Sequence, residues 1–225
     1  MPAPAPAPLT LPRLSWGDPS TERRALLVHG LAPRALDYSI EAYAAELRGA
    51  RPGHGRGWDL VLAHSLGGAA ATVVAASDPA WTDRLVLVDP AIHLAPRDRD
   101  IVRASQERSF ADPTIAAVRA EHPHWHPHDI ELKALSARQA SQWAVEQTSL
   151  QNAAWDVRDA ASRLTVPTHV IGSDPKVYSI FTGQLAEEVL TNPVIGMSVV
   201  ADAGHSPHRD KPEATIAEFL KVIGG

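Results

Sequence analysis

Ser65 is the residue whose surroundings point most directly to covalent chemistry. It follows the apolar run Leu60–Ala63 and His64, and the residues after it, Leu66–Ala71, are mostly glycine and alanine. This order is typical of a buried strand that turns sharply into a helix, a turn that projects a serine hydroxyl beside the backbone N–H groups of the helix start. We therefore predict that Ser65 is a nucleophile. The alternative is an Ala/Gly-rich helix that a serine precedes by chance.

A strand-to-helix turn of this kind requires strands and helices in alternation, and the chain shows them. The predicted strands are the short apolar runs Ala25–Val28, Leu60–Ala63, Leu85–Val88, Thr168–Ile171 and Met197–Val200. Predicted helices cover about Asp37–Arg48, Leu66–Ser77, Phe181–Leu190 and Glu213–Val222. This alternation predicts an α/β fold, with a mostly parallel sheet of five to six strands and helices on both of its faces.

The composition narrows the class of protein. The chain has 225 residues, of which 44% are hydrophobic and 21% charged, as expected for a single globular domain. Its formal net charge of −5 gives no basic field, so we expect no nucleic-acid partner. It contains no cysteine, which excludes disulfides, thiolate catalysis and cysteine-ligated metals. No apolar run is long enough to span a membrane and no secretory signal is present, so the expected location is the cytoplasm.

Changes in composition along the chain predict its organisation. Residues 1–8 alternate proline and alanine and are predicted to be a disordered arm. Residues 9–92 and 164–225 contain the strand-like runs and are the predicted core. Residues 93–163 contain none, and their charged, proline-bounded pieces predict a helical insertion after the third strand.

Four segments together resemble the signature of the α/β-hydrolase fold. These are Leu27-Val28-His29-Gly30, His64-Ser65-Leu66-Gly67-Gly68, Pro167 to Pro175 and Gly204-His205, in that order. The resemblance spans about residues 25–222. It implies a serine hydrolase whose nucleophile, acid and histidine follow one another along the chain, each on a loop after a strand. It also implies that the insertion is a cap over the site.

His205 fits the histidine position of this family. It lies just beyond the last apolar run, on a glycine-containing loop before the final helix, and we predict that it is the general base. Asp174 follows the fourth run and is the expected acid, although the segment is one residue shorter than the family pattern. Asp89, at the end of the third run, is the alternative acid. For either carboxylate, the competing interpretation is a helix or turn cap.

The oxyanion hole is expected to use the backbone N–H groups of Leu31 and Leu66, at the positions that the resemblance implies. However, only 36 positions separate His29 from Ser65, where the family has a helix, a strand and a second helix. We infer that one helix and one strand are absent. The remaining strands could still pair as parallel neighbours, but one face of the sheet would lose a covering helix. The expected consequence is exposed apolar surface with lower stability or with self-association into a homo-oligomer.

The insertion offers candidate pocket residues. Trp125, Trp143 and Trp155, together with His64, are candidates for the substrate pocket. The alternative for the tryptophans is that they attach the cap to the core. The segment His122-Pro123-His124-Trp125-His126-Pro127-His128 superficially resembles a metal site, but its prolines prevent helical presentation of the imidazoles. We expect a solvated loop there and no metal.

The sequence thus predicts a serine hydrolase that cleaves an ester, lactone or related acyl bond of a small, rather apolar molecule without a cofactor. Thioesterases, C–C bond hydrolases and cofactor-free haloperoxidases use the same triad and stay open. A second hypothesis follows from the inferred missing segment: a catalytically impaired relative that retains the pocket and acts as a small-molecule binding protein.

Overall fold

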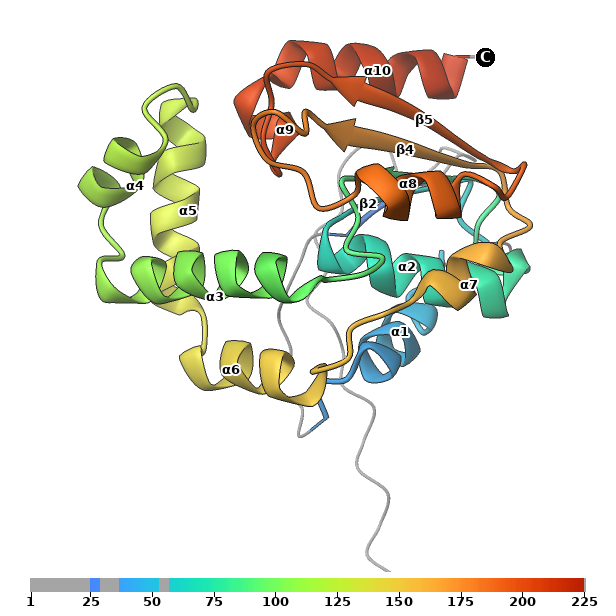
Figure 1. Cartoon of the computed structure of the whole chain (residues 1–225), viewed down its shortest axis with the longest axis horizontal. Helices are drawn as coiled ribbons and strands as arrows, with labels where there is room; N and C mark the ends of the chain where they lie inside the picture. The colour runs from blue at the N-terminus through green and yellow to red at the C-terminus, as the bar shows by residue number, and fades with distance from the viewer. Residues whose placement is uncertain (1–24, 29–36, 53–56, 225) are drawn as a thin grey trace, which may run out of the picture.

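The described part of the chain forms a sheet, part of which is seen in Figure 1, of five parallel strands that lie side by side in the order in which they occur along the chain. The computed structural model describes residues 25–28, 37–52 and 57–224. The strands are β1 (Ala25–Val28), β2 (Leu60–His64), β3 (Leu85–Val88), β4 (Thr168–Ser173) and β5 (Ile195–Val200). The α/β class, the parallel sheet and all five predicted strands are confirmed.

The pairing of β1 with β2 settles how the short interval between them is accommodated. The two strands are parallel neighbours, with Ala25 opposite Leu60 and Val28 opposite Ala63. The connection between them contains helix α1 (Ile40–Arg48), which begins at Ser39, whose side chain accepts a hydrogen bond from the N–H of Ala42. This confirms the prediction that the strands close up as neighbours. The segment His29-Gly30 lies outside the described residues, as does the arm at residues 1–8.

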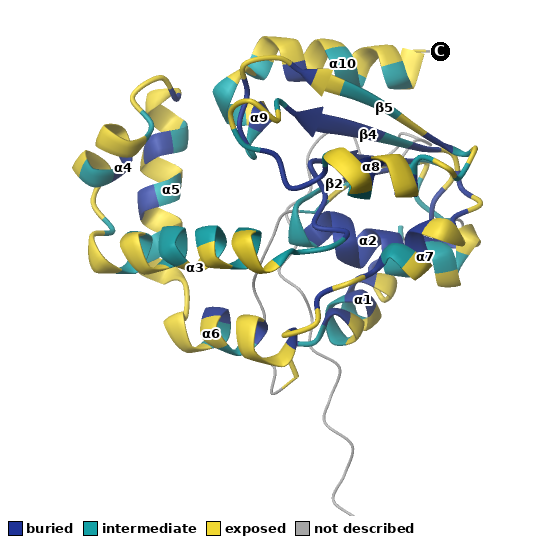
Figure 2. Cartoon of the chain, in the orientation of Figure 1, coloured by how far each residue is buried: buried dark blue, intermediate teal, exposed yellow. Residues whose placement is uncertain are grey.

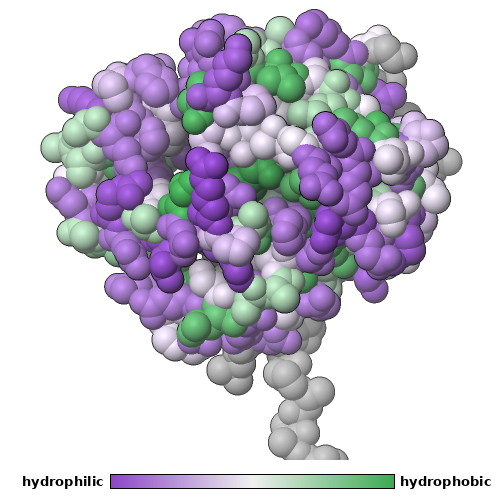
Figure 3. Space-filling model, viewed as in Figure 1, coloured by the Kyte–Doolittle hydropathy of each residue, from purple (hydrophilic) through white to green (hydrophobic). Residues whose placement is uncertain are grey.

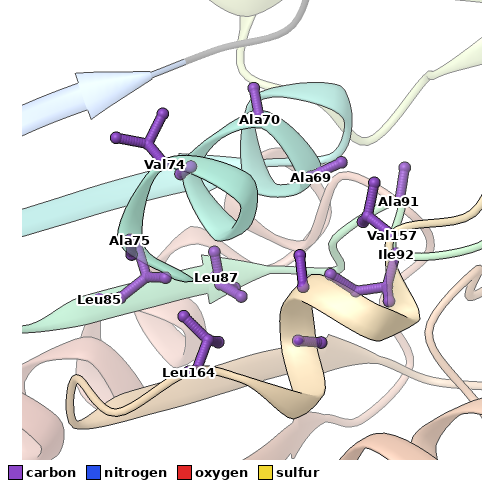
Figure 4. Packing of buried hydrophobic residues seen from close by; sticks show 14 of the residues in the cluster. Ala69, Ala70, Val74, Ala75, Leu85, Leu87, Ala91, Ile92, Val157 and Leu164 are labelled. Carbon is purple, nitrogen blue, oxygen red and sulfur yellow. The ribbon is translucent and has the colours of Figure 1, made fainter. Parts of the chain in front are cut away.

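One face of the sheet carries the main hydrophobic core. Helix α2 (Leu66–Ser77) packs there between the strands and α7 (Arg158–Ser162), as the labelled alanines and valines of Figure 4 show. Helices α1 and α8 (Gly183–Val189) contribute to the same cluster. The small side chains of α2 let it approach the strands closely, and Ala69, Ala71 and Val74 have no exposed surface.

The other face is covered by α10 (Pro212–Gly224), which contacts β4 and β5. Phe219 and Val222 pack on Val86, Val88, Ile171 and Val200 of the sheet. The spacing of apolar residues correctly predicts this helix. However, several of these apolar side chains are exposed to solvent: Ile216, Leu220 and Ile223 are 40–56% exposed. Leu27 of β1 is 65% exposed. The expected apolar surface is therefore present at this side of the described chain.

The interval between β3 and β4 is helical. It contains α3 (Pro96–Ala111), α4 (Ile115–Glu121), α5 (Pro127–Gln139) and α6 (Gln142–Gln151), followed by α7. Helices α3 to α6 lie beside the sheet and expose many residues, whereas α2 and β4 are largely buried (Figures 1 and 2). By contrast, Ala160 and Ala161 of α7 belong to the main core. The helical segment outside the main core therefore comprises α3 to α6 and ends before α7. A short helix η1 (Pro79–Trp81) and helix α9 (Pro207–Asp210) complete the described elements.

Candidate active site

Ser65 occupies a strained turn between β2 and α2. Its φ of 53° and ψ of −120° lie in a region that residues with a side chain seldom adopt, at a cost of about 1–3 kcal/mol. The strain persists because the backbone on both sides is held: the Ser65 N–H donates to Val88 O (3.1 Å), and the Ser65 carbonyl accepts from the N–H of Ala91 (3.1 Å). The sequence signal of an apolar run followed by small residues corresponds to this turn.

Gly68 shows why small residues are needed just after the turn. A Cβ atom at this position would lie 2.8 Å from Cβ of Pro90 and 3.2 Å from its Cα. The first turn of α2 therefore packs directly against the segment that follows β3. This contact brings the start of α2 close to Asp89, the residue before Pro90.

His205 joins the serine to a carboxylate. It lies on the loop after β5, with Nε2 2.9 Å from Oγ of Ser65 and Nδ1 2.7 Å from Oδ2 of Asp89. In this arrangement the imidazole can accept the serine proton at Nε2 while Nδ1–H donates to the carboxylate. Three residues from the ends of three strands thus form one continuous chain of hydrogen bonds.

The surroundings of Asp89 keep its carboxylate ionised although the residue is fully buried. Burial by itself would raise its pKa, but the bond to His205 and further bonds lower the pKa below its usual value. The Ser179 hydroxyl donates to Oδ1 (2.6 Å), and the N–H groups of Ile180 and Phe181 donate to Oδ2 and Oδ1 (3.2 and 3.3 Å). A buried carboxylate with this many donors is a strong partner for an imidazolium.

The expectation that Asp174 orients His205 is corrected by this geometry. Asp174 caps a turn: its Oδ1 accepts from the N–H of Lys176 (2.9 Å) and its Oδ2 from the N–H of Asp202 (3.0 Å). These backbone bonds lower its pKa. The reason lies in the surroundings of the two carboxylates. The Asp174 carboxylate is engaged by the backbone of its own turn and of Asp202, whereas the buried Asp89 carboxylate, at the end of the strand next to β2, is held by Ser179, Ile180 and Phe181 and bonds to His205.

His64 has a structural contact that its position in the sequence did not reveal. Its Nε2 lies 2.8 Å from the carbonyl oxygen of His205, and its ring lies 4.8 Å from that of His205 and 4.9 Å from that of His208. Burial, and then the neighbouring His205 and His208, lower its pKa to about 3. His64 is therefore neutral at pH 7, so Nε2–H donates to the carbonyl. The imidazole thereby holds the His205 loop against the end of β2.

Two of the candidate pocket tryptophans anchor the helical segment to the core. The Trp155 indole donates to Ala91 O (2.6 Å) and the ring is 7% exposed. The Trp125 indole donates to Oδ1 of Asp210 (2.6 Å). Trp143 is 51% exposed and meets Tyr38 edge to face, with 5.5 Å between ring centres. These contacts favour attachment over pocket lining for Trp125 and Trp155.

Of the two expected oxyanion donors, Leu66 is described and Leu31 is not. Leu66 is the first residue of the 12-residue helix α2. The first N–H groups of a helix have no partner within it, and the helix dipole makes them good donors to a developing negative charge. Leu66 is therefore placed to supply one donor next to Ser65. Leu31 lies outside the described residues.

Other parts of the described chain carry no comparable site. Within residues 25–28, 37–52 and 57–224, no group of three metal-binding side chains is suitably placed for a metal ion, and this includes the four histidines of the segment 122–128. The same ranges contain no helix that is both long and apolar enough to cross a bilayer. A surface hollow of about 480 Å³ is polar and contains no residue of the Ser65 site; it is lined by Asp156, Arg158, Asp159, Ser162 and Glu188.

Comparisons with known proteins find a matching family model and a similar protein of known name. The model of the Alpha/beta hydrolase family matches residues 5–218. Lipase LipV of Mycobacterium tuberculosis is 39% identical over 98 residues, which are 43% of this chain and 37% of that lipase. The chain thus matches little more than a third of that relative's length.

Two solved structures share the fold over almost the whole chain. A carboxylesterase structure from Nitrososphaera gargenis has a TM-score of 0.74 at 12% identity and covers 93% of this chain and 92% of that one. An N-formylmaleamic acid deformylase from Pseudomonas putida S16 has a TM-score of 0.71 at 23% identity, over 89% of this chain and 93% of that one. At these low sequence identities, the similarity shows a shared fold and nothing further.

Proposed function

Because the chain belongs to the alpha/beta hydrolase family, we propose that it is a serine hydrolase that cleaves an ester, lactone or related acyl bond of a small apolar substrate. The observation that carries this proposal is the chain of contacts from Ser65 Oγ to His205 Nε2 (2.9 Å) and from His205 Nδ1 to Asp89 (2.7 Å). A lipase and carboxylesterases among the similar proteins support an acyl bond as the target.

In the first half of the reaction, Ser65 Oγ attacks the carbonyl carbon of the substrate as its proton passes to Nε2 of His205. The resulting imidazolium is stabilised by the ionised Asp89, and the N–H of Leu66 donates to the negatively charged oxygen. When the tetrahedral intermediate collapses, the bond to the leaving group breaks and His205 returns the proton to the departing oxygen. The acyl group is then bonded to Ser65.

In the second half, water attacks the acyl carbon and gives one proton to His205. Collapse of the second intermediate breaks the bond to Ser65 Oγ, which takes the proton back and releases the carboxylic acid. Every proton in this cycle passes through the one imidazole, so the buried Asp89 needs only to orient it and balance its charge.

We assign the role of a cap to helices α3 to α6. Hydrophobic residues show near the middle of the face in Figure 3, between these helices on the left and the core elements on the right, in a surface that is otherwise largely hydrophilic. In this role the helices cover the triad, limit access of water and favour an apolar substrate.

Labelling with a fluorophosphonate tests the nucleophile without knowledge of the substrate. We expect intact-mass analysis to show one adduct on the parent and none on Ser65→Ala. Ser198→Ala is a matched control because the hydroxyl of Ser198 also lies next to a histidine, 3.0 Å from Nε2 of His169. This variant should be labelled like the parent.

A folded parent that takes no label would count against the serine hydrolase and favour the small-molecule binding protein. Circular dichroism of all three proteins is needed to check that they are folded. A panel of esters, lactones and thioesters then separates the acyl bonds that share this triad.

A further inference from the structure

Asp210 connects the cap to the loop that carries His205. The turn between α4 and α5 faces α9 in Figure 1. The Trp125 indole donates to Oδ1 of Asp210 (2.6 Å), and His124 Nε2 lies 3.0 Å from the same oxygen. The other carboxylate oxygen, Oδ2, accepts the backbone N–H of Gly204 (2.7 Å), the residue immediately before His205.

Glycine at position 204 leaves room for this contact. A Cβ atom there would lie 3.1 Å from Oδ2 of Asp210 and 3.5 Å from Cγ1 of Val177. The carboxylate therefore lies directly against the backbone of the His205 loop. Burial by itself would raise the pKa of Asp210, but the bonds from Trp125, His124 and Gly204 lower it, so the group is a charged acceptor.

The donor on the cap side is fixed by packing. Trp125 is 6% exposed and belongs to a small cluster of the cap with Val118, Ile130 and Ala134. Its ring stacks on His122 with 3.8 Å between centres, and the guanidinium of Arg209 lies 5.0 Å from the ring centre. A rigid indole on the cap thus meets a carboxylate whose other oxygen holds the catalytic loop.

We propose that Asp210 is a positioning residue that couples docking of the cap to the orientation of His205. When Trp125 is docked, Asp210 is held in place and keeps the Gly204 N–H, and with it the His205 imidazole, aligned between Ser65 and Asp89. The segment 122–128 then serves as the contact between cap and triad. This inference rests on the proposed function for its effect on the reaction, but its structural part can be tested independently.

Hydrogen–deuterium exchange tests the coupling in the absence of any substrate. Trp125→Phe retains an aromatic ring and removes the N–H that reaches Asp210. We expect the amides of residues 202–206 to exchange several-fold faster in this variant. Trp58→Phe is the matched control, because it removes an indole N–H bonded to the backbone carbonyl of Ala50 (2.9 Å) elsewhere in the core. Unchanged exchange in Trp125→Phe, or the same increase in Trp58→Phe, would overturn the coupling.

Kinetics test the positioning role. Asp210→Asn retains one oxygen but cannot accept from both Trp125 and Gly204. With p-nitrophenyl acetate we expect kcat to fall about tenfold with little change in KM, and the fluorophosphonate labelling rate to fall in parallel. A loss confined to KM, or full activity, would refute positioning of His205.

The outcomes also separate the two proposals. A parent that is not labelled at Ser65 contradicts the proposed function, while the exchange experiment still decides the coupling. A parent that is labelled, with an Asp210→Asn variant that matches it, contradicts the role of Asp210 alone.

Discussion

At the scale of single residues, the decisive difference lies between two aspartates that follow consecutive strands. Asp89 has no exposed surface and receives bonds from His205, Ser179 and two backbone N–H groups. The hydrogen bonds described for the Asp174 carboxylate come from backbone N–H groups alone, one in its own turn and one of Asp202. A buried charge requires such partners, whereas a turn cap does not, so the environment of each residue indicates its role.

Asp89→Asn and Asp174→Asn separate the two assignments. Asparagine in place of Asp89 cannot balance the imidazolium and holds His205 in the wrong tautomer, so we expect kcat to fall by about 10⁴-fold. Asp174→Asn should leave kcat close to that of the parent. The measurement is hydrolysis of p-nitrophenyl acetate at pH 7, with circular dichroism to confirm folding. If Asp174→Asn lost as much activity as Asp89→Asn, the assignment would be wrong.

At the scale of elements, the site depends on contacts between the ends of strands and the loops that follow them. The end of β2 is tied to the loop after β5 by the bond from His64 to His205 O (2.8 Å). The start of α2 is tied to the segment after β3 by the close contact of Gly68 with Pro90. Each contact joins segments that lie far apart in the sequence but share one edge of the parallel sheet.

The neutral His64 makes stability depend on pH. In the unfolded chain this imidazole binds a proton below about pH 6.5, but in the folded protein its pKa is about 3. Between these values the unfolded state binds more protons, so the free energy of unfolding falls as the pH falls. From pH 7 to 4.5 we expect a loss of about 2–3 kcal/mol from this residue.

Urea denaturation at pH 7 and 4.5 measures the effect. His64→Gln retains an N–H donor but does not titrate, so its stability should fall less than that of the parent over this range. His208 and Asp89 are present in both proteins, so the comparison measures the contribution of His64 together with its coupling to these neighbours. Equal losses in parent and variant would show that His64 does not remain neutral in the folded state.

At the scale of the whole molecule, the two faces of the sheet are covered unequally. Helices α1, α2, α7 and α8 contribute to the core on one face, and α10 packs on β4 and β5 on the other. Towards β1, Leu60 and Leu62 are only partly buried and Leu27 is 65% exposed. This is the side of the sheet on which the short interval after β1 predicts that a covering helix is absent.

We expect this apolar surface to promote self-association. Sedimentation velocity should show a sedimentation coefficient that rises with protein concentration, and Leu220→Glu should reduce that rise because it places a charge on the exposed side of α10. Leu150→Glu is the control, since Leu150 is 69% exposed on α6 of the cap. A parent that sediments as one monomeric species at all concentrations would contradict the expectation.

The sequence by itself determined the elements and the reactive turn. Apolar runs located β1 and β3 at the bounds that the structure has, and the Ala/Gly-rich stretch located α2 together with the turn at Ser65. These features depend on side-chain periodicity and on steric limits at a tight turn, and both act between near neighbours in the chain.

Only the tertiary structure decided which aspartate meets His205 and what the histidine-rich segment does. Asp89 and Asp174 have the same chemistry and similar positions after strands, and only their burial and their hydrogen-bond partners in the folded chain distinguish them. The bond from Trp125 to Asp210 joins residues 85 positions apart. Such contacts are set by how the sheet, the cap and the loops pack together, so no local pattern encodes them.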